Sequence, residues 1–232
     1  MSERLLEYLR LANVGRHERV DGGELDPHLR LLREWQSERL ARTYADLLDH
    51  PRYGPACRFF LTDVYAPQDF SQRDHDIIRV YESMHRLLPP PLLRVLELVI
   101  ALNALTHDLD EALLRVLVDE LGMDEALTEE IYAEAYRRCD NYAERSDQID
   151  LVVEIGRGVE ELVHKPAVGL ALKLARVPAR LAGWHEHQDF LERGFHAFKR
   201  LDRAEEFLQT ISERERRILD RIYAGAPDPF EP

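Results

Sequence analysis

Residues 92–105 read LLRVLELVIALNAL, and Arg94 and Glu97 are the only charged side chains in this stretch. A helix that is apolar on nearly every side is normally surrounded by other helices rather than laid on a surface. We therefore expect this segment at the centre of a helical core. The residues that follow, 108–121, either begin a fresh helix or continue this one.

Outward from this segment, apolar residues recur every three or four positions, which is the period of an α-helix. Further helices are expected at residues 2–12, 27–50, 53–65, 71–88, 128–142, 146–164, 167–176, 186–201 and 203–223. The sequence thus predicts an all-α fold, a single multi-helix bundle of about eight to ten helices. Its expected divisions are an N-terminal helix and loop (1–24), one helical domain (25–224) and a flexible tail (225–232).

Composition narrows the class of protein. With 44 acidic and 31 basic residues, the net charge of −13 repels phosphate backbones, so no nucleic-acid partner is expected. Cys57 and Cys139 lie outside any metal-binding spacing and are typical of free thiols in a reducing compartment. The N-terminus does not resemble a signal peptide, and no apolar run approaches the roughly 20 residues that cross a bilayer. We therefore expect a cytoplasmic protein without a transmembrane segment.

Three segments carry a resemblance to a known family: RFFLTDVYAPQDFSQRD at 58–74, LARVPARLAGWHEHQDFLERGFHAFKRL at 174–201 and FLQTISERERRIL at 207–219. Together they resemble an uncharacterised family of bacterial, specifically proteobacterial, all-helical proteins that share a domain of unknown function. The resemblance extends from about residue 35 onward. It implies a bacterial cytoplasmic protein and brings no catalytic residue, cofactor or partner with it.

The block at 58–74 has two interpretations. In the first it is a corner between two helices, where aromatic side chains such as Phe59 and Phe60 fill the core and arginine–carboxylate pairs clamp the turn. In the second it forms the polar wall of a ligand cleft, since binding pockets combine an apolar lining with a few converging polar groups. The candidate binding residues of this cleft are Arg58, Asp63, Tyr65, Asp69, Arg73 and Asp74.

A basic strip departs from the acidic character of the chain. No acidic residue occurs between Glu161 and Glu186, while four cations accompany regularly spaced aliphatic residues: Lys165, Lys173, Arg176 and Arg180. Such a strip would dock on a membrane surface, on an acidic partner or on the acidic helices of the same chain. Pro166 and Pro178 argue against a long membrane-binding helix, so a protein contact is the preferred functional interpretation.

Two Glu-x-x-His steps, Glu82–His85 and Glu161–His164, suggest a metal site. Di-iron carboxylate proteins use this spacing, because residues three apart lie on one face of a helix. A chain rich in Glu contains such pairs by chance, however, and both histidines are expected in last helical turns, where the helix dipole favours a cation without any metal. An iron site is therefore kept only as the alternative.

Two classes of function remain. The favoured one is a non-catalytic protein-interaction or regulatory module, because the sequence has no convincing nucleophile or cofactor loop. The alternative is a metal-dependent, di-iron carboxylate-like enzyme or a small-molecule binder with its site in the bundle core. A homodimer through the last helix, with Phe207, Ile211, Ile218 and Ile222, is compatible with both. In the favoured interpretation, polar side chains lie on the outside of the helices or clamp their corners.

Overall fold

The computed structural model describes residues 19–20, 24–64, 90–124, 126–181 and 185–231. Within these ranges the all-α prediction is confirmed, and the one extended feature is a two-residue antiparallel ribbon of β1 (Arg19–Val20) and β2 (Glu24–Leu25). The helices described are α2 (Pro27–Thr43), α3 (Ala45–Asp49), α4 (Gly54–Phe59), α6 (Pro90–Arg115), α7 (Glu129–Cys139), α8 (Tyr142–Val163), α9 (Pro166–Leu181), α10 (His185–Lys199) and α11 (Glu205–Tyr223). Short π-helical segments extend α4 and α6, as η2 (Phe60–Val64) and η3 (Val116–Glu120).

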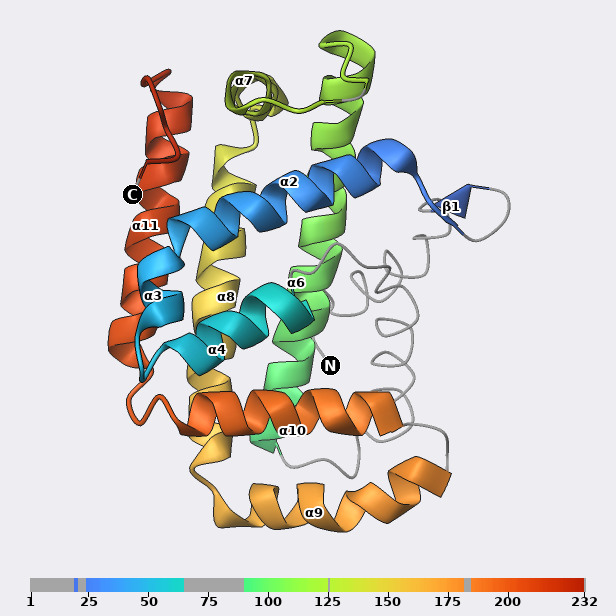
Figure 1. The fold of residues 1–232 in the computed structure, drawn as a ribbon, viewed down its shortest axis with the longest axis vertical. Coiled ribbons are helices and arrows are strands. Elements are labelled where there is room, and N and C mark those ends of the chain that lie inside the picture. Colours follow the sequence, from blue (N-terminus) through green and yellow to red (C-terminus); the bar gives the residue numbers. More distant parts are fainter. Residues whose placement is uncertain (1–18, 21–23, 65–89, 125, 182–184, 232) are drawn as a thin grey trace.

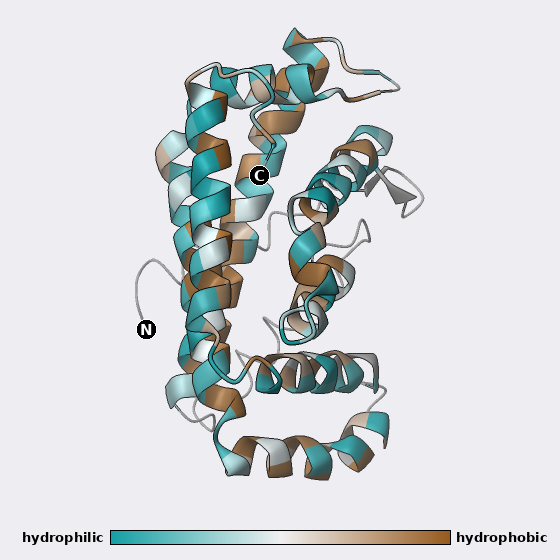
Figure 2. Cartoon of the chain, turned by 60° about the vertical axis from the view of Figure 1, so that its left-hand side comes forward, coloured by the Kyte–Doolittle hydropathy of each residue, from teal (hydrophilic) through white to brown (hydrophobic). Residues whose placement is uncertain are grey.

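The described helices form two layers. Helices α6, α8 and α11 run side by side along the long axis of the molecule (Figure 1). Helices α2, α4 and α10 cross in front of them, and the turned view in Figure 2 shows α2, α3 and α4 as a separate layer beside the first. Helix α9 lies at one end of the molecule and packs on α10.

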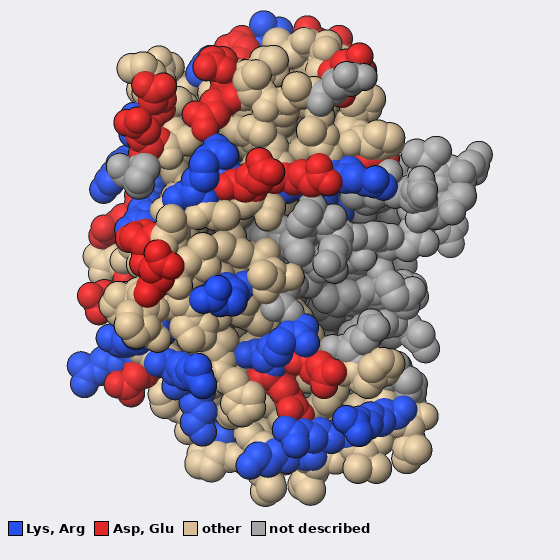
Figure 3. Space-filling view, in the orientation of Figure 1, with Lys and Arg blue, Asp and Glu red and all other residues tan. Residues whose placement is uncertain are grey.

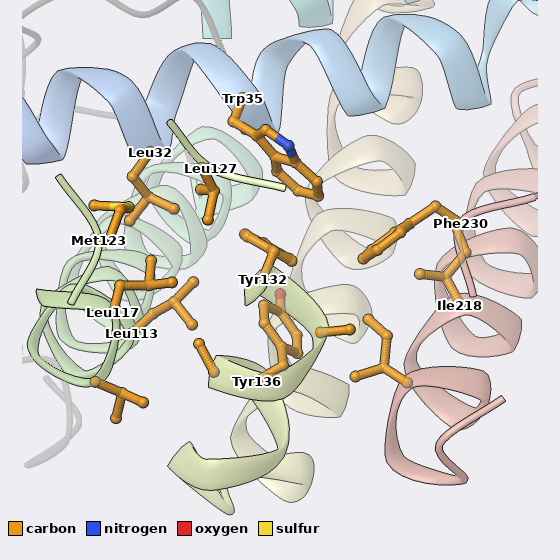
Figure 4. Packing of buried hydrophobic residues seen from close by; sticks show 14 of the residues in the cluster. Leu32, Trp35, Leu113, Leu117, Met123, Leu127, Tyr132, Tyr136, Ile218 and Phe230 are labelled. Carbon is orange, nitrogen blue, oxygen red and sulfur yellow. The ribbon is translucent and has the colours of Figure 1, made fainter. Parts of the chain in front are cut away.

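Buried apolar side chains gather in two clusters. In the first, Trp35 of α2 stacks on Tyr132 of α7 with the ring centroids 4.0 Å apart, and Phe230 meets both rings edge-on (Figure 4). The second lies where α3, α4, α8, α10 and α11 meet, and Phe198 and Phe207 are buried in it. Both clusters draw on residues distant in sequence, so each ties the two layers together.

The stretch 92–105 lies inside α6, which packs along α8. Val95, Ile100 and Ala104 of this stretch are buried. The residues of α6 that belong to the first cluster, Leu113 among them, lie beyond the stretch, and so does Leu117 of η3. Because no Gly or Pro interrupts residues 92–121, the helical turns continue past residue 108 instead of restarting there.

Local signals place the helix ends. The Asp26 carboxylate accepts hydrogen bonds from the backbone N–H groups of His28 (2.9 Å) and Leu29 (3.1 Å), and Pro27 is the first helical residue. Aspartate at the N-cap followed by proline is a favourable start for a helix. The helix expected to reach residue 50 is instead divided at Tyr44 into α2 and α3.

Helix α9 is longer than expected. It runs through Pro178 to Leu181, whereas the sequence predicts a short piece ending near Arg176. A proline inside a helix leaves the carbonyl four residues earlier without its donor. That residue is Leu174, which lies on the exposed side of α9. No described helix is long and apolar enough to cross a bilayer.

Two glycines of α8 permit close helix packing. A Cβ on Gly156 would collide with the buried Leu208 of α11, and one on Gly158 would lie 2.6 Å from a Val95 methyl of α6. The absence of a side chain at both positions therefore sets how closely α8 approaches its neighbours.

The C-terminal residues fold back on α11. The Arg221 guanidinium donates to the backbone carbonyls of Asp228 (2.6 Å) and Glu231 (2.8 Å), and Phe230 is buried in the first cluster. The apolar side chains of α11 likewise pack inside the molecule, since Phe207, Ile218 and Ile222 are buried. These three residues are not available as a dimer face.

Candidate functional site

A pocket of ≈ 250 Å³ lies in the core between the two layers. This core pocket is bordered by α2, α6, α7, α8 and α11, and its lining includes aromatic rings of Phe60, Phe207 and Phe230. Its volume far exceeds the roughly 10–15 Å³ that one water molecule needs. What distinguishes the core pocket is that ionisable side chains from four different helices also line it.

The first polar group is an ion pair between the layers. Arg39 of α2 donates from Nη1 to both carboxylate oxygens of Glu215 on α11, at 2.6 and 2.9 Å. The Tyr44 hydroxyl donates to the same carboxylate at 2.8 Å. Burial opposes the charge of Arg39, yet the facing Glu215 keeps the pKa of the guanidinium raised. The Nε of Arg39 is buried and has no hydrogen-bond partner among the described residues.

The second polar group centres on Asp110 of α6, which is 7 % exposed. Gln36 of α2 donates from Nε2 to its carboxylate at 3.1 Å. Burial raises the pKa of Asp110, although the neighbouring Arg145, the hydrogen bond from Gln36 and the positive charge of Arg33 all act in the opposite direction. Asp110 therefore takes up a proton more readily than an exposed aspartate does.

The third polar group is Arg145 of α8, which is 4 % exposed. Its Nη2 donates to the backbone carbonyl of Leu109 at 3.1 Å, and its guanidinium carbon lies 4.3 Å from the ring centroid of Tyr136. Its Nε is buried without a hydrogen-bond partner in the described ranges. A buried guanidinium is costly unless paired, and a carbonyl and an aromatic face compensate its charge only in part.

Two further groups at the core pocket are held in their neutral forms. Burial raises the pKa of the Tyr132 hydroxyl well above its usual value. Burial likewise raises the pKa of the Cys57 thiol to about 11, which makes this cysteine a poor nucleophile. Cys57 is a free thiol, as the sequence predicts, and it is buried.

These positions correct the expectation that polar side chains stay on the outside or at corners. Arg39, Asp110 and Arg145 are all buried, and they converge on one interior pocket. The signal was present in the sequence: on α2, Gln36 and Arg39 share the inward face with Leu32 and Trp35. A charged residue at an apolar position of the helical period is a sign of a buried polar site.

Most of the predicted cleft lies outside the described part of the chain. Tyr65, Asp69, Arg73 and Asp74 fall in the undescribed range 65–89, and the Asp63 side chain is not described either. The Arg58 side chain is exposed, while Phe59 and Phe60 pack against the second cluster. The cleft interpretation therefore stays a prediction.

The basic strip is in part bound to the molecule itself. Lys165 pairs with Glu161 at 2.7 Å, and Arg176 forms two hydrogen bonds with Glu192 of α10, at 2.7 and 2.6 Å. Lys173 and Arg180 are exposed on α9. Arg176 therefore follows the interpretation in which the basic strip docks on an acidic helix of the same chain.

The predicted metal ligands are brought together only within one helix. Glu161 and His164 are exposed at the end of α8, where the His164 Nδ1 lies 2.8 Å from the Glu160 carbonyl oxygen. Glu82 and His85 lie outside the described residues. In the part of the chain that is described, no three His, Cys, Asp or Glu residues are grouped so as to hold a metal ion. Whether the two Glu-x-x-His steps meet stays untested.

Comparison with known proteins places the chain in a family. No curated protein and no solved structure matches it. One family model matches residues 16–229, which is most of the chain and begins earlier than the expected start near residue 35. The origin of the chain and the family status of the quoted segments stay predictions. By this match the chain belongs to the family described as domain of unknown function DUF8198.

Proposed function

We propose that this protein binds a small anionic molecule with an apolar body in the core pocket. The observation that carries the proposal is Arg145, a buried guanidinium at the core pocket with an Nε that lacks a partner among the described residues. A carboxylate or phosphate matches the planar fork of a guanidinium and would complete its hydrogen bonds.

The charges around Arg145 favour an anion. Arg39 is matched by Glu215, so the carboxylate left to balance Arg145 is Asp110. Because burial raises the pKa of Asp110, this carboxyl loses its negative charge more readily than an exposed aspartate does. A bound anion would take over the role of counter-charge, and the rings of Phe60 and Phe207 would cover an apolar or aromatic body.

This proposal develops the small-molecule alternative from the sequence rather than the protein-interaction module. The di-iron alternative is less well supported, because Glu161 is engaged by Lys165 and is exposed at the end of α8, away from the residues that line the core pocket. A protein-interaction role would have to use an outer surface of the molecule.

Benzoate and its neutral analogue benzamide provide a direct test. At a hundred times its Kd a ligand adds about 2.7 kcal/mol to the free energy of unfolding, which raises the Tm by about 5–10 °C for a chain of this size. We expect benzoate to raise the Tm of the wild-type protein and benzamide to have little effect. Calorimetric titration would measure the affinity for each compound.

The matched variants are Arg145→Gln and Arg157→Gln, both on α8. Arg157 is 55 % exposed and pairs with Glu205 on the surface, so its loss should leave the response to benzoate intact. Arg145→Gln should abolish that response. Equal stabilisation by benzoate and benzamide, no stabilisation by benzoate, or an unchanged response in Arg145→Gln would each contradict the proposal.

A further inference from the structure

Helix α9 presents a continuous apolar face to the outside. Four aliphatic side chains make up this α9 stripe: Leu170 is 58 % exposed, Leu174 68 %, Val177 67 % and Leu181 85 %. Their spacings of four, three and four residues place them on one side of the helix. Isolated exposed leucines are ordinary, but a contiguous stripe on one helix marks a surface that contacts something else.

The opposite face of α9 is fastened to α10, so the orientation of the stripe is fixed. Arg176 is hydrogen-bonded to Glu192, and Gln188 donates to the Leu172 carbonyl at 2.8 Å. A Cβ on Gly169 would lie 3.1 Å from the Phe195 ring, so the two helices are in close contact. The stripe is therefore exposed because α9 is held in place, and not because the helix lacks packing.

Charge indicates what covers the stripe. α9 contains no acidic residue and carries Lys173, Arg176 and Arg180. At 100° per residue Lys173 and Arg180 lie beside the stripe, while Arg176 lies farther round the helix, toward α10, and Figure 3 shows the row of basic side chains along this end of the molecule. This is a local positive surface on a chain whose net charge is −13.

An anionic bilayer fits this surface better than a protein does. The stripe contains only Leu and Val, whereas the centres of protein interfaces are enriched in Trp, Tyr, Phe, Met and Arg. A second copy would bring the same cations together if it paired through α9. Helices that lie in the membrane interface combine Leu-rich and Lys/Arg-rich faces, and α9 lies at the end of the molecule, where it can meet a flat surface (Figure 1).

We propose that α9 docks the protein on an anionic lipid surface, with the stripe inserted among the lipid chains and Lys173 and Arg180 at the headgroups. This surface is separate from the core pocket, so the proposal does not depend on the ligand.

The test is sedimentation of the full chain with vesicles of phosphatidylcholine alone or mixed with phosphatidylserine. We expect binding to the mixed vesicles that weakens as salt is raised, and little binding to phosphatidylcholine alone. The variant Lys173→Gln/Arg180→Gln should lower the apparent affinity for the mixed vesicles about 30-fold. Leu174→Gln/Leu181→Gln should lower it at least about tenfold.

Arg115→Gln on α6 is the control for loss of one exposed cation, since Arg115 is 63 % exposed and lies outside α9. It should bind like the wild type, and the melting curves of all variants should match, because every substituted side chain is exposed. Absence of sedimentation, or equal loss with Arg115→Gln, would overturn the proposal. So would a wild-type dimer in gel filtration that Leu174→Gln/Leu181→Gln converts to a monomer, because a second copy would then cover the stripe.

Discussion

Asp110 is the residue whose charge state decides what the core pocket can hold. Its folded-state pKa is raised by burial, so folding and protonation favour each other. A carboxyl with a raised folded pKa stabilises the protein at low pH and loses that contribution as pH rises through the folded pKa. At neutral pH the charged form therefore weakens the fold.

Asp110→Asn removes this charge and keeps an oxygen to accept from Gln36. We expect the variant to be at least as stable as the wild type at neutral pH in urea unfolding, with the difference shrinking as the pH is lowered. A variant that is clearly less stable at neutral pH would mean that Arg145 stabilises a charged carboxylate at Asp110.

The Arg39–Glu215 pair gives a second prediction at this scale. The side chains are 10 % and 19 % exposed, and removing one partner of a buried pair leaves the other charge uncompensated. Glu215→Gln should lower the free energy of unfolding by about 3 kcal/mol. Glu129→Gln is the control, because its pair with Arg42 is 42–54 % exposed and should contribute under about 1 kcal/mol. Equal losses in urea unfolding would show that the Arg39–Glu215 pair is not effectively buried.

Among the elements, α8 shows how far a sequence pattern can be taken. Its two helical glycines cost conformational stability, and contact with Leu208 and Val95 supplies the physical reason for them. Glycines inside a helix are thus a sign of close packing. The sequence did not show which helices approach, because that depends on residues 52 positions later and 63 positions earlier in the chain.

Substituting these glycines tests the packing. Gly156→Ala gains about 1 kcal/mol in helix propensity, but overpacking against buried Leu208 costs about 1–3 kcal/mol. We expect a lower Tm for Gly156→Ala and for Gly158→Ala. Arg157→Ala, at the exposed position between them, should change the Tm little. A rise in Tm for Gly156→Ala would mean that α8 and α11 are not in close contact.

The prolines show where a local rule was overridden. The helix was expected to end near Arg176, yet α9 continues through Pro178 to Leu181 and is held by contacts with α10. Helix propensity gives the free-energy cost of a proline inside a helix, but packing against neighbouring helices decides whether the helix forms despite that cost. The amphipathic length of α9 was underestimated for this reason.

For the whole molecule, periodicity was enough to predict an all-α fold, since the period of three to four residues survives any arrangement of the helices. The core pocket was harder to foresee. Arg39, Asp110, Arg145 and Glu215 are separated by 35 to 71 positions, and only the crossing of α2 over the α6–α8–α11 layer brings them together (Figure 1). A pocket whose lining comes from several helices far apart in the chain leaves no single motif in the sequence.

Acid should weaken the contacts between helices. Asp46, Glu192 and Glu205 each pair with an arginine from another helix, and those arginines hold all three carboxyl pKa values below their usual range, that of Glu192 at about 2. Such groups stabilise the fold above their unfolded pKa, and the contribution is lost as pH falls toward the folded pKa. We expect the Tm to fall between about pH 5 and pH 2, and the change should be modest because each pair has at least one exposed partner. A Tm that is constant over this range would contradict these pairings.

The central claim is that buried charges from four helices form a binding site for an anion. A crystal structure grown with 4-bromobenzoate tests it most directly, because the anomalous signal of bromine locates the ligand independently of the protein phases. The account predicts bromine density inside the core pocket, with the carboxylate within hydrogen-bonding distance of the Arg145 guanidinium. A pocket filled by protein side chains, or bromine found only on the outer surface, would contradict it.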